Sequence, residues 1–455
     1  MKQRETFQSR LGFLLLSAGC AIGIGNVWRF PYIVGENGGG AFVLFYVLFL
    51  IIMGVPVLSM EFAVGRASRK SPVKAYQELE PKGSKWHLHG YVALLGNYVL
   101  MMFYTTVAGW MMYYFYSFLT GKFQGMNADQ VSGAFGEMLG NPGINLFWMV
   151  LVVVLGILIC AQGLQKGVER ITKTMMLGLL ALMIVLAVRG ITLEGGTEGL
   201  KFYLMPDLER MKEVGIGNVI VAAMNQSFFT LSLGIGAMAI FGSYLEKNNT
   251  LLGEAVNVAI LDTFVAFTAG LIIFPACFAF GVNPDSGPSL IFITLPNVFI
   301  EMPGGRVWGA LFFIFMSFAA FSTVIAVFEN IIACDMELFN LDRKKSAAMN
   351  LVLIILLSIP CALGSNLLSG FQPLGPGTAV LDLEDFIVSN VLLPLGSLIY
   401  LVFCTCKYGW GFSKYQEEAN IGTGLKVKSW MRWHFTIVVP ILILVLFWLG
   451  IKKFF

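Results

Sequence analysis

The chain has 455 residues, of which 57% are hydrophobic, 14% aromatic and 13% charged. Soluble domains carry roughly 25% charged residues, and the mean hydropathy here is +0.77. This composition excludes a disordered chain, a collagen-like repeat and an ordinary soluble enzyme. A net charge of +3 is too small to indicate a nucleic-acid partner. An all-α, polytopic protein of the lipid bilayer remains.

Eleven apolar segments are long enough for a spanning helix, which needs about 20 residues. They are residues 11–35, 39–65, 89–119, 144–162, 167–189, 216–245, 251–281, 306–338, 347–365, 384–407 and 434–453. Residues 281–306, which contain four prolines, are expected to form a structured loop with short helical pieces. With the N-terminus inside, 21 Lys and Arg residues fall on the cytoplasmic side and 8 outside. The positive-inside rule therefore predicts a cell (inner or plasma) membrane protein with a cytoplasmic N-terminus and an outside C-terminus.

Two of the segments contain glycine-rich interruptions, at residues 19–26 and 232–236. Irregular backbone at membrane depth is tolerated where it is buried in protein or lines a cavity. The interruptions lie five segments apart, and paired breaks in two halves are typical of a transporter's midplane site. Close helix packing is the alternative explanation for each glycine cluster. We therefore expect a single domain over residues 1–455, with one repeat at about 11–189, a second at about 216–407 and an extra helix at about 434–453.

Two motifs carry a resemblance to a known family. The sequence GNVWRFPY at 25–32, followed by ENGGGAF at 36–42, and the sequence FFTLSLG at 228–234 resemble signatures of the neurotransmitter:sodium symporter family. The similarity extends from about residue 4 to residue 453. It implies a LeuT-type 5+5 inverted repeat with helices 1 and 6 broken, eleven transmembrane helices as in many bacterial members, and Na⁺-coupled uptake of amino acids or their derivatives.

The resemblance also implies two sodium sites and no organic cofactor. Na⁺ is a hard cation that takes oxygen ligands. The first site, Na1, is expected to use Ala21, Asn26, Thr230 and Asp262. The second site, Na2, is expected to use Gly19, Ile22, Ala319, Ser322 and Thr323.

The substrate site implied by the resemblance lies between the two breaks. Its carboxylate would meet the free N–H groups near Ile24 and Gly25, and Tyr104 would donate its hydroxyl to the same carboxylate. The complete expected set is Ala21, Ile24, Gly25, Leu100, Tyr104, Phe229, Thr230, Ser232, Ile235, Thr323 and Val327. The expected gates are Arg29 with Asp385 outside, and Arg4 and Phe7 inside, with Asp335 or Glu337 as the partner of Arg4.

Departures from the family pattern refine the expected substrate. Gly23 stands where monoamine transporters of the family carry an aspartate, which favours a substrate that brings its own carboxylate. Asp262 falls where most members have asparagine, and Ala266 where chloride-dependent members have serine. A carboxylate at Asp262 would offset the charge of two Na⁺ ions, so we expect chloride-independent transport; pairing elsewhere or protonation is the alternative. The apolar walls favour neutral hydrophobic or aromatic L-amino acids, with tyrosine among the candidates.

Other functions remain open at this point. The chain could carry GABA- or betaine-like solutes, or it could be an amino-acid receptor or channel that does not couple movement to Na⁺. No catalytic constellation stands out, so an enzyme is not expected. Glu61 and Glu329 are expected to pair at helix ends or inside the bundle. The protein is expected to be a monomer or a homodimer.

Overall fold

The computed structural model describes residues 5–281 and 289–452. Over these residues the chain is helical, and its β-structure is a single isolated bridge between Asn249 and Thr423. The first half contains α1 (Arg10–Ala21), η1 (Gly25–Arg29), α2 (Phe30–Glu36), α3 (Gly40–Phe49), η2 (Leu50–Gly54), α4 (Val55–Ser68), α5 (Pro72–Leu79), α6 (Leu88–Thr120), α7 (Ala128–Gly140), α8 (Pro142–Ala161), η3 (Leu164–Glu169), α9 (Arg170–Ile191), α10 (Gly196–Leu204) and α11 (Leu208–Val214), where η marks a π-helical turn.

The second half follows the same all-helical pattern. It contains α12 (Ile216–Phe229), α13 (Ala237–Tyr244), α14 (Leu251–Ala279), η4 (Leu290–Thr294), α15 (Leu295–Glu301), α16 (Gly305–Leu338), α17 (Arg343–Leu363), α18 (Val380–Phe386), η5 (Ile387–Leu392), α19 (Leu393–Thr405), α20 (Phe412–Ala419), α21 (Met431–Trp433), η6 (His434–Val438) and α22 (Val439–Lys452). The short helices η4 and α15 form part of the structured loop expected between 281 and 306, and residues 282–288 of that loop lie outside the described residues.

Nine helices among the described residues are long and apolar enough to cross a bilayer. A tenth candidate is the pair formed by α1 and Gly25–Glu36, which bends by 56° at its break. Helices α12 and α13 are each too short to span, and residues 230–236 separate them. Together they correspond to the sixth segment expected from the sequence. The two predicted interruptions are therefore real breaks in helical structure.

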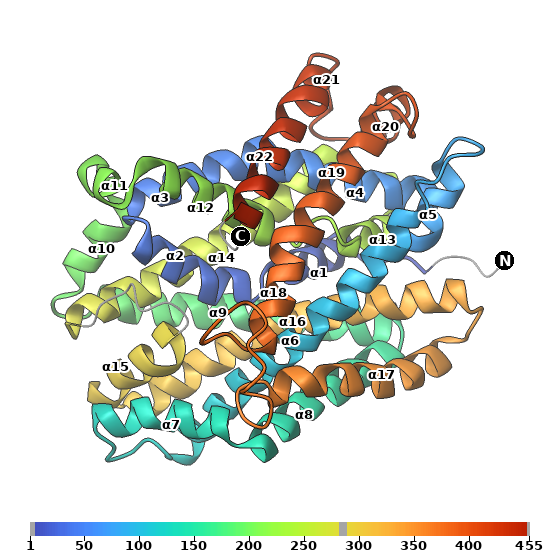
Figure 1. Ribbon diagram of the computed structural model, residues 1–455. Coiled ribbons are helices and arrows are strands. Elements are labelled where there is room, and N and C mark those ends of the chain that lie inside the picture. Colours follow the sequence, from blue (N-terminus) through green and yellow to red (C-terminus); the bar gives the residue numbers. More distant parts are fainter. Residues whose placement is uncertain (1–4, 282–288, 453–455) are drawn as a thin grey trace.

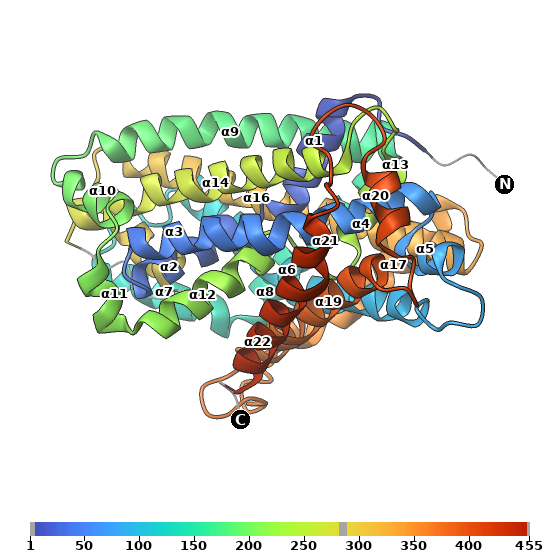
Figure 2. The same ribbon diagram turned by 90° about the horizontal axis from the view of Figure 1, so that it is seen from above.

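The spanning helices surround α16, in which 83% of the most apolar stretch is buried. Figure 1 shows α6 and α1 against this central helix, and α7, α8 and α17 on one outer side of the bundle. Helices α5 and α13 lie at one end, and α10, α11 and α15 lie at the opposite end. In the view from above, α9 and α14 run side by side along one edge (Figure 2). The breaks in α1 and α12–α13 are thereby enclosed by protein.

Small residues allow α4 and α13 to pack backbone against backbone. A Cβ atom added at Gly65 of α4 would collide with the backbone oxygen of Ala239 in α13. A Cβ atom added at Gly242 of α13 would collide with the backbone oxygen of Phe62 in α4. Without a hydrophobic driving force in lipid, such close contact is a main source of helix association. The glycines therefore hold the short half-helix α13 in place.

Gly65→Ala should destabilise the fold, because the added methyl group meets backbone that cannot rotate away. Overpacking of this kind costs about 1–3 kcal/mol, so the melting temperature of the purified protein should fall by several degrees. Gly136→Ala in α7 is the matched control, since nothing lies within 4 Å of a Cβ atom there. An equal melting temperature for both variants would contradict the proposed role of close packing.

Candidate substrate and sodium sites

The first break releases backbone groups that side chains from other helices then satisfy. Ile22 leaves the helix in an extended conformation, with φ −71° and ψ 91°. The N–H of Ile24 donates to the Tyr104 hydroxyl at 2.9 Å. The carbonyl of Gly25 accepts from the Gln226 side chain at 2.9 Å. The Ile24 N–H was expected to donate a hydrogen bond to a substrate carboxylate. In this structure it donates to the Tyr104 hydroxyl instead.

The second break depends on left-handed backbone between Thr230 and α13. Ser232, Gly234 and Gly236 have φ values of 51°, 97° and 75°. At Gly234 an added Cβ atom would lie 2.8 Å from the Ser397 nitrogen, so both conformation and space require glycine. The N–H of Gly234 donates to the buried carboxylate of Glu61. Glu61 thus binds a helix end, as expected.

A cluster of buried polar groups surrounds Asp262 of α14, where Na1 was expected. The Asn26 amide donates to one Asp262 carboxylate oxygen at 2.8 Å, and the Thr230 hydroxyl donates to the other at 2.9 Å. Tyr46 adds a third donor at 3.3 Å. All four side chains are fully buried. Tyr46 was not anticipated at this site, because one tyrosine in an apolar segment carries no motif.

A second oxygen cluster joins α1 to α16, where Na2 was expected. The Ser322 hydroxyl lies 2.9 Å from the Gly19 carbonyl, 3.3 Å from that of Ile22 and 2.9 Å from that of Ala319. The Thr323 hydroxyl lies 3.2 Å from the Gly19 carbonyl. The structure therefore brings all five expected residues together. Their neutral oxygens fit a hard monovalent cation in chemical type.

A small cavity of about 20 Å³ lies between the two breaks, with room for about one water molecule. It is lined by Ala21, Gly23, Gly25, Leu100, Tyr104, Phe229, Ser232, Thr323, Val388 and Leu393. Seven of these residues belong to the expected substrate set. Four other residues of the expected set do not line the cavity as the structure describes it, namely Ile24, Thr230, Ile235 and Val327. Val388 and Leu393 were not anticipated, because neither belongs to a motif.

Ser389, which was not anticipated from the sequence, connects the two residues of the expected outer gate. An Arg29 guanidinium nitrogen lies 3.5 Å from the Ser389 hydroxyl. That hydroxyl donates to an Asp385 carboxylate oxygen at 2.7 Å. The Arg29 guanidinium also lies 4.1 Å from the centre of the Phe229 ring, which lines the cavity. Ser389 therefore links the two gate charges above the cavity.

At the N-terminal end of the bundle, Phe7 packs edge-on against Phe13 and Tyr244. The expected partner Asp335 accepts from Tyr98 at 2.9 Å and from the Asn350 amide at 2.7 Å. Arg4 lies outside the described residues, so its pairing stays a prediction.

The other candidate partner, Glu337, accepts from the Ser71 hydroxyl at 2.7 Å. An ion pair that was not anticipated joins Arg343 to Glu329 at 2.6 Å, and Tyr244 donates to the same carboxylate at 2.8 Å. Glu329 is therefore paired inside the bundle, as expected. The sequence indicated that Glu329 requires a partner, because a buried acid needs a cation or several donors, but it did not indicate Arg343.

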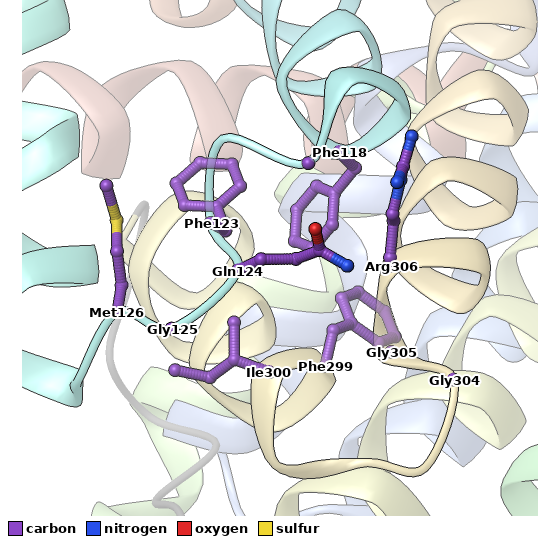
Figure 3. A pocket seen from close by; sticks show the side chains of 11 residues that line it. Phe118, Phe123, Gln124, Gly125, Met126, Phe299, Ile300, Gly304, Gly305 and Arg306 are labelled. Atoms are coloured by element: carbon purple, nitrogen blue, oxygen red, sulfur yellow. The ribbon is translucent and has the colours of Figure 1, made fainter.

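A wider hollow of about 510 Å³ opens far from these clusters (Figure 3). Phe118, Phe123 and Phe299 line it together with Gln124 and Arg306, where α6 and α15 end and α16 begins. Phe118 lies fourteen positions beyond Tyr104 on α6, which is about 21 Å along the helix axis. This hollow is therefore separate from the oxygen clusters and from the cavity between the breaks.

The sodium:neurotransmitter symporter family model matches residues 4–132 and 122–455 of the chain. The chain is 35% identical over 441 residues to the uncharacterized sodium-dependent transporter YhdH of Bacillus subtilis, covering 96% of both. It is 34% identical to an uncharacterized sodium-dependent transporter of Haemophilus influenzae, covering 98% of both. Its structure is similar to the crystal structure of MhsT in complex with L-phenylalanine, with 38% identity and a TM-score of 0.87 over 98% of this chain and 100% of that one.

These similarities confirm the expected LeuT-type fold and the transporter class, and they exclude an enzyme. The chain belongs to the sodium:neurotransmitter symporter family and is a sodium-dependent membrane transporter.

Proposed function

We propose that this protein is a symporter that couples Na⁺ entry to the uptake of neutral hydrophobic or aromatic L-amino acids. The observation that carries the proposal is the small cavity between two broken helices, with one oxygen cluster around Asp262 and another around Ser322. A symporter must bind substrate and ion in the same closed state. Thr323 lines the cavity and also belongs to the Ser322 cluster, and this shared residue supports such joint binding.

The chemistry of the cavity supports an amino acid with an apolar side chain. Leu100, Phe229, Val388 and Leu393 supply apolar wall, and none of the described residues that line the cavity carries a charged side chain. A Cβ atom at Gly23 would collide with the Tyr104 hydroxyl, so the closed site leaves no room for an amine-binding aspartate. The similarity to a transporter solved with L-phenylalanine points to the same class. The cavity must widen to admit such a molecule.

The charge of Asp262 supports transport without chloride. Two Na⁺ ions and a zwitterion bring two positive charges into the protein interior, where unpaired charge is strongly unfavourable. Asp262 supplies one negative charge beside the expected Na1 ligands. Ala266, one helical turn further along α14, has no polar side chain that could bind an anion. Asp262 therefore takes the place of a chloride ion in this proposal.

Alternating access would open the cavity to each side in turn. In this proposal, Arg29, Ser389 and Asp385 close the cavity on one side. The aromatic contact between Phe7 and Tyr244 helps to close it on the other side. We place the N-terminus in the cytoplasm, in line with the distribution of Lys and Arg. In that orientation the Arg29 group is the outer gate.

Purified protein in sealed liposomes with an imposed Na⁺ gradient should accumulate a labelled aromatic or aliphatic L-amino acid, with or without chloride. Unlabelled substrate inside should also drive uptake of label, because a carrier exchanges and a channel or receptor does not. Uptake that requires chloride would overturn the role of Asp262 and leave the symporter intact. Preference for GABA or betaine over L-amino acids would overturn the proposed substrate class.

Asp262→Asn keeps the size of the side chain and removes its charge. The apparent Na⁺ affinity for uptake should fall about tenfold, which corresponds to about 1.4 kcal/mol. Asp129→Asn is the control, because Asp129 is an exposed acid at the start of α7. Equal Na⁺ dependence of the two variants would show that Asp262 does not take part in Na⁺ binding.

Removal of the Ser322 and Thr323 hydroxyls should also weaken Na⁺ binding, because only neutral oxygens form that cluster. Na⁺ titration of the double variant S322A/T323V should show at least a tenfold rise in half-saturating concentration. Ser317→Ala on the same helix is the matched control. It also removes a buried hydroxyl, but that hydroxyl donates to the Phe313 carbonyl of its own helix at 2.7 Å. A shift of the same size in S317A would argue against a specific site.

A further inference from the structure

Glu384 is a buried acid that the proposed mechanism does not use. It lies on α18, directly before the gate residue Asp385, and is 4% exposed. Both oxygens of its carboxyl group lack a hydrogen-bond donor among the described residues. Asp385, in contrast, accepts from Ser389. Two adjacent acids of one short helix therefore differ in their environments, because only Asp385 has a hydrogen-bond donor in the described part of the chain.

Within the part of the chain that the structure describes, no positively charged group lies beside Glu384. The Cys361 thiol of α17 lies beside the carboxyl group, and Thr106 of α6 lies beside the same thiol. Helix α6 has no Lys, Arg, Asp or Glu along its length, and η5 has none either. The basic residues of α17 are at its opposite end, where Lys345 is sixteen positions or about 24 Å from Cys361.

The other acids near Glu384 are on its own helix and cannot neutralise it. Asp382 accepts the backbone N–H of Ala379 at the start of α18, and Asp385 faces the gate. A thiol is a weak donor, and an ionised carboxylate without strong donors or a cation is highly unfavourable in an apolar interior. The neutral acid is therefore the form that fits the closed arrangement. This contrasts with Asp262, which has three donors.

We propose that Glu384 is a proton-binding site coupled to the outer gate. Because Asp385 and Glu384 are on the same helix, movement of α18 that separates Asp385 from Arg29 also moves the Glu384 carboxyl away from Cys361 and towards water. In the open state the O–H bond of Glu384 breaks, the proton passes to a water molecule, and the electron pair stays on the carboxylate. Closing the gate requires a proton to return. This inference rests on the proposed function.

The direction of the pH effect follows from this cycle. A higher external pH favours the ionised carboxylate, which is stable only in the open, hydrated arrangement. Closure then becomes less favourable, and the rate of uptake falls. A lower external pH supplies the proton and favours closure. Glu384→Gln fixes a neutral side chain of nearly the same shape, so its closure should not depend on this proton.

The first experiment compares Na⁺-driven uptake by wild type and E384Q in liposomes over a range of external pH at saturating Na⁺. Wild-type uptake should fall severalfold from neutral to alkaline pH, and E384Q should keep most of its neutral-pH rate. Glu301→Gln is the control, because Glu301 is an exposed acid at the end of α15, and its profile should match the wild type. Identical profiles for wild type and E384Q would overturn the proposal.

The second experiment does not depend on transport. Infrared difference spectra of the purified protein, recorded between neutral and alkaline pH, should contain the carbonyl stretch of a protonated carboxyl that E384Q lacks. Glu384→Leu, which is apolar and neutral, serves where E384Q does not fold. The proton site would be overturned if the spectra of E384Q and E384L contained every protonated-carboxyl band of the wild-type spectrum. Absence of uptake together with the Glu384 band would overturn the proposed function and keep the site.

Discussion

The structure depends on one constraint, that backbone groups released inside an apolar bundle must be bound by other parts of the protein. The two helix breaks release such groups beside one cavity, and side chains from neighbouring helices bind them. Tyr104 accepts the Ile24 N–H, and Glu61 accepts the Gly234 N–H. The Asn97 amide donates to the Ile235 carbonyl at 2.7 Å. These bonds explain why α4 and α6 lie close to the breaks.

The same constraint creates the oxygen clusters. A continuous helix uses its carbonyls in its own hydrogen bonds, so Gly19 and Ile22 can face Ser322 only because α1 ends there. The bonds between Ser322 and these carbonyls join the first broken helix to the central helix α16. A cation that replaced them would strengthen the connection between the two helices. Ion binding at this cluster would therefore be linked to the positions of α1 and α16.

Two buried acids show how surroundings decide the use of a carboxyl group. Asp262 is enclosed by donors from three other segments, whereas Glu384 lies beside a thiol. The first arrangement stabilises negative charge and suits a cation, and the second favours the neutral form. At the expected outer gate, Ser389 connects Asp385 to Arg29, and the Arg29 guanidinium also packs over the Phe229 ring. Charge at the gate is thereby connected to the wall of the cavity.

The sequence by itself determined the helical class, the positions of both breaks and most of the residues that form the two oxygen clusters and the cavity wall, because apolar length, glycine clusters and two family motifs are local properties of the chain. It did not indicate Tyr46, Ser389, Val388 or the pairing of Arg343 with Glu329. Nor did it separate the roles of Glu384 and its neighbour Asp385. Only the tertiary structure decided these, since a hydrogen bond or an uncompensated burial depends on which helices meet, and those partners lie far apart in the chain.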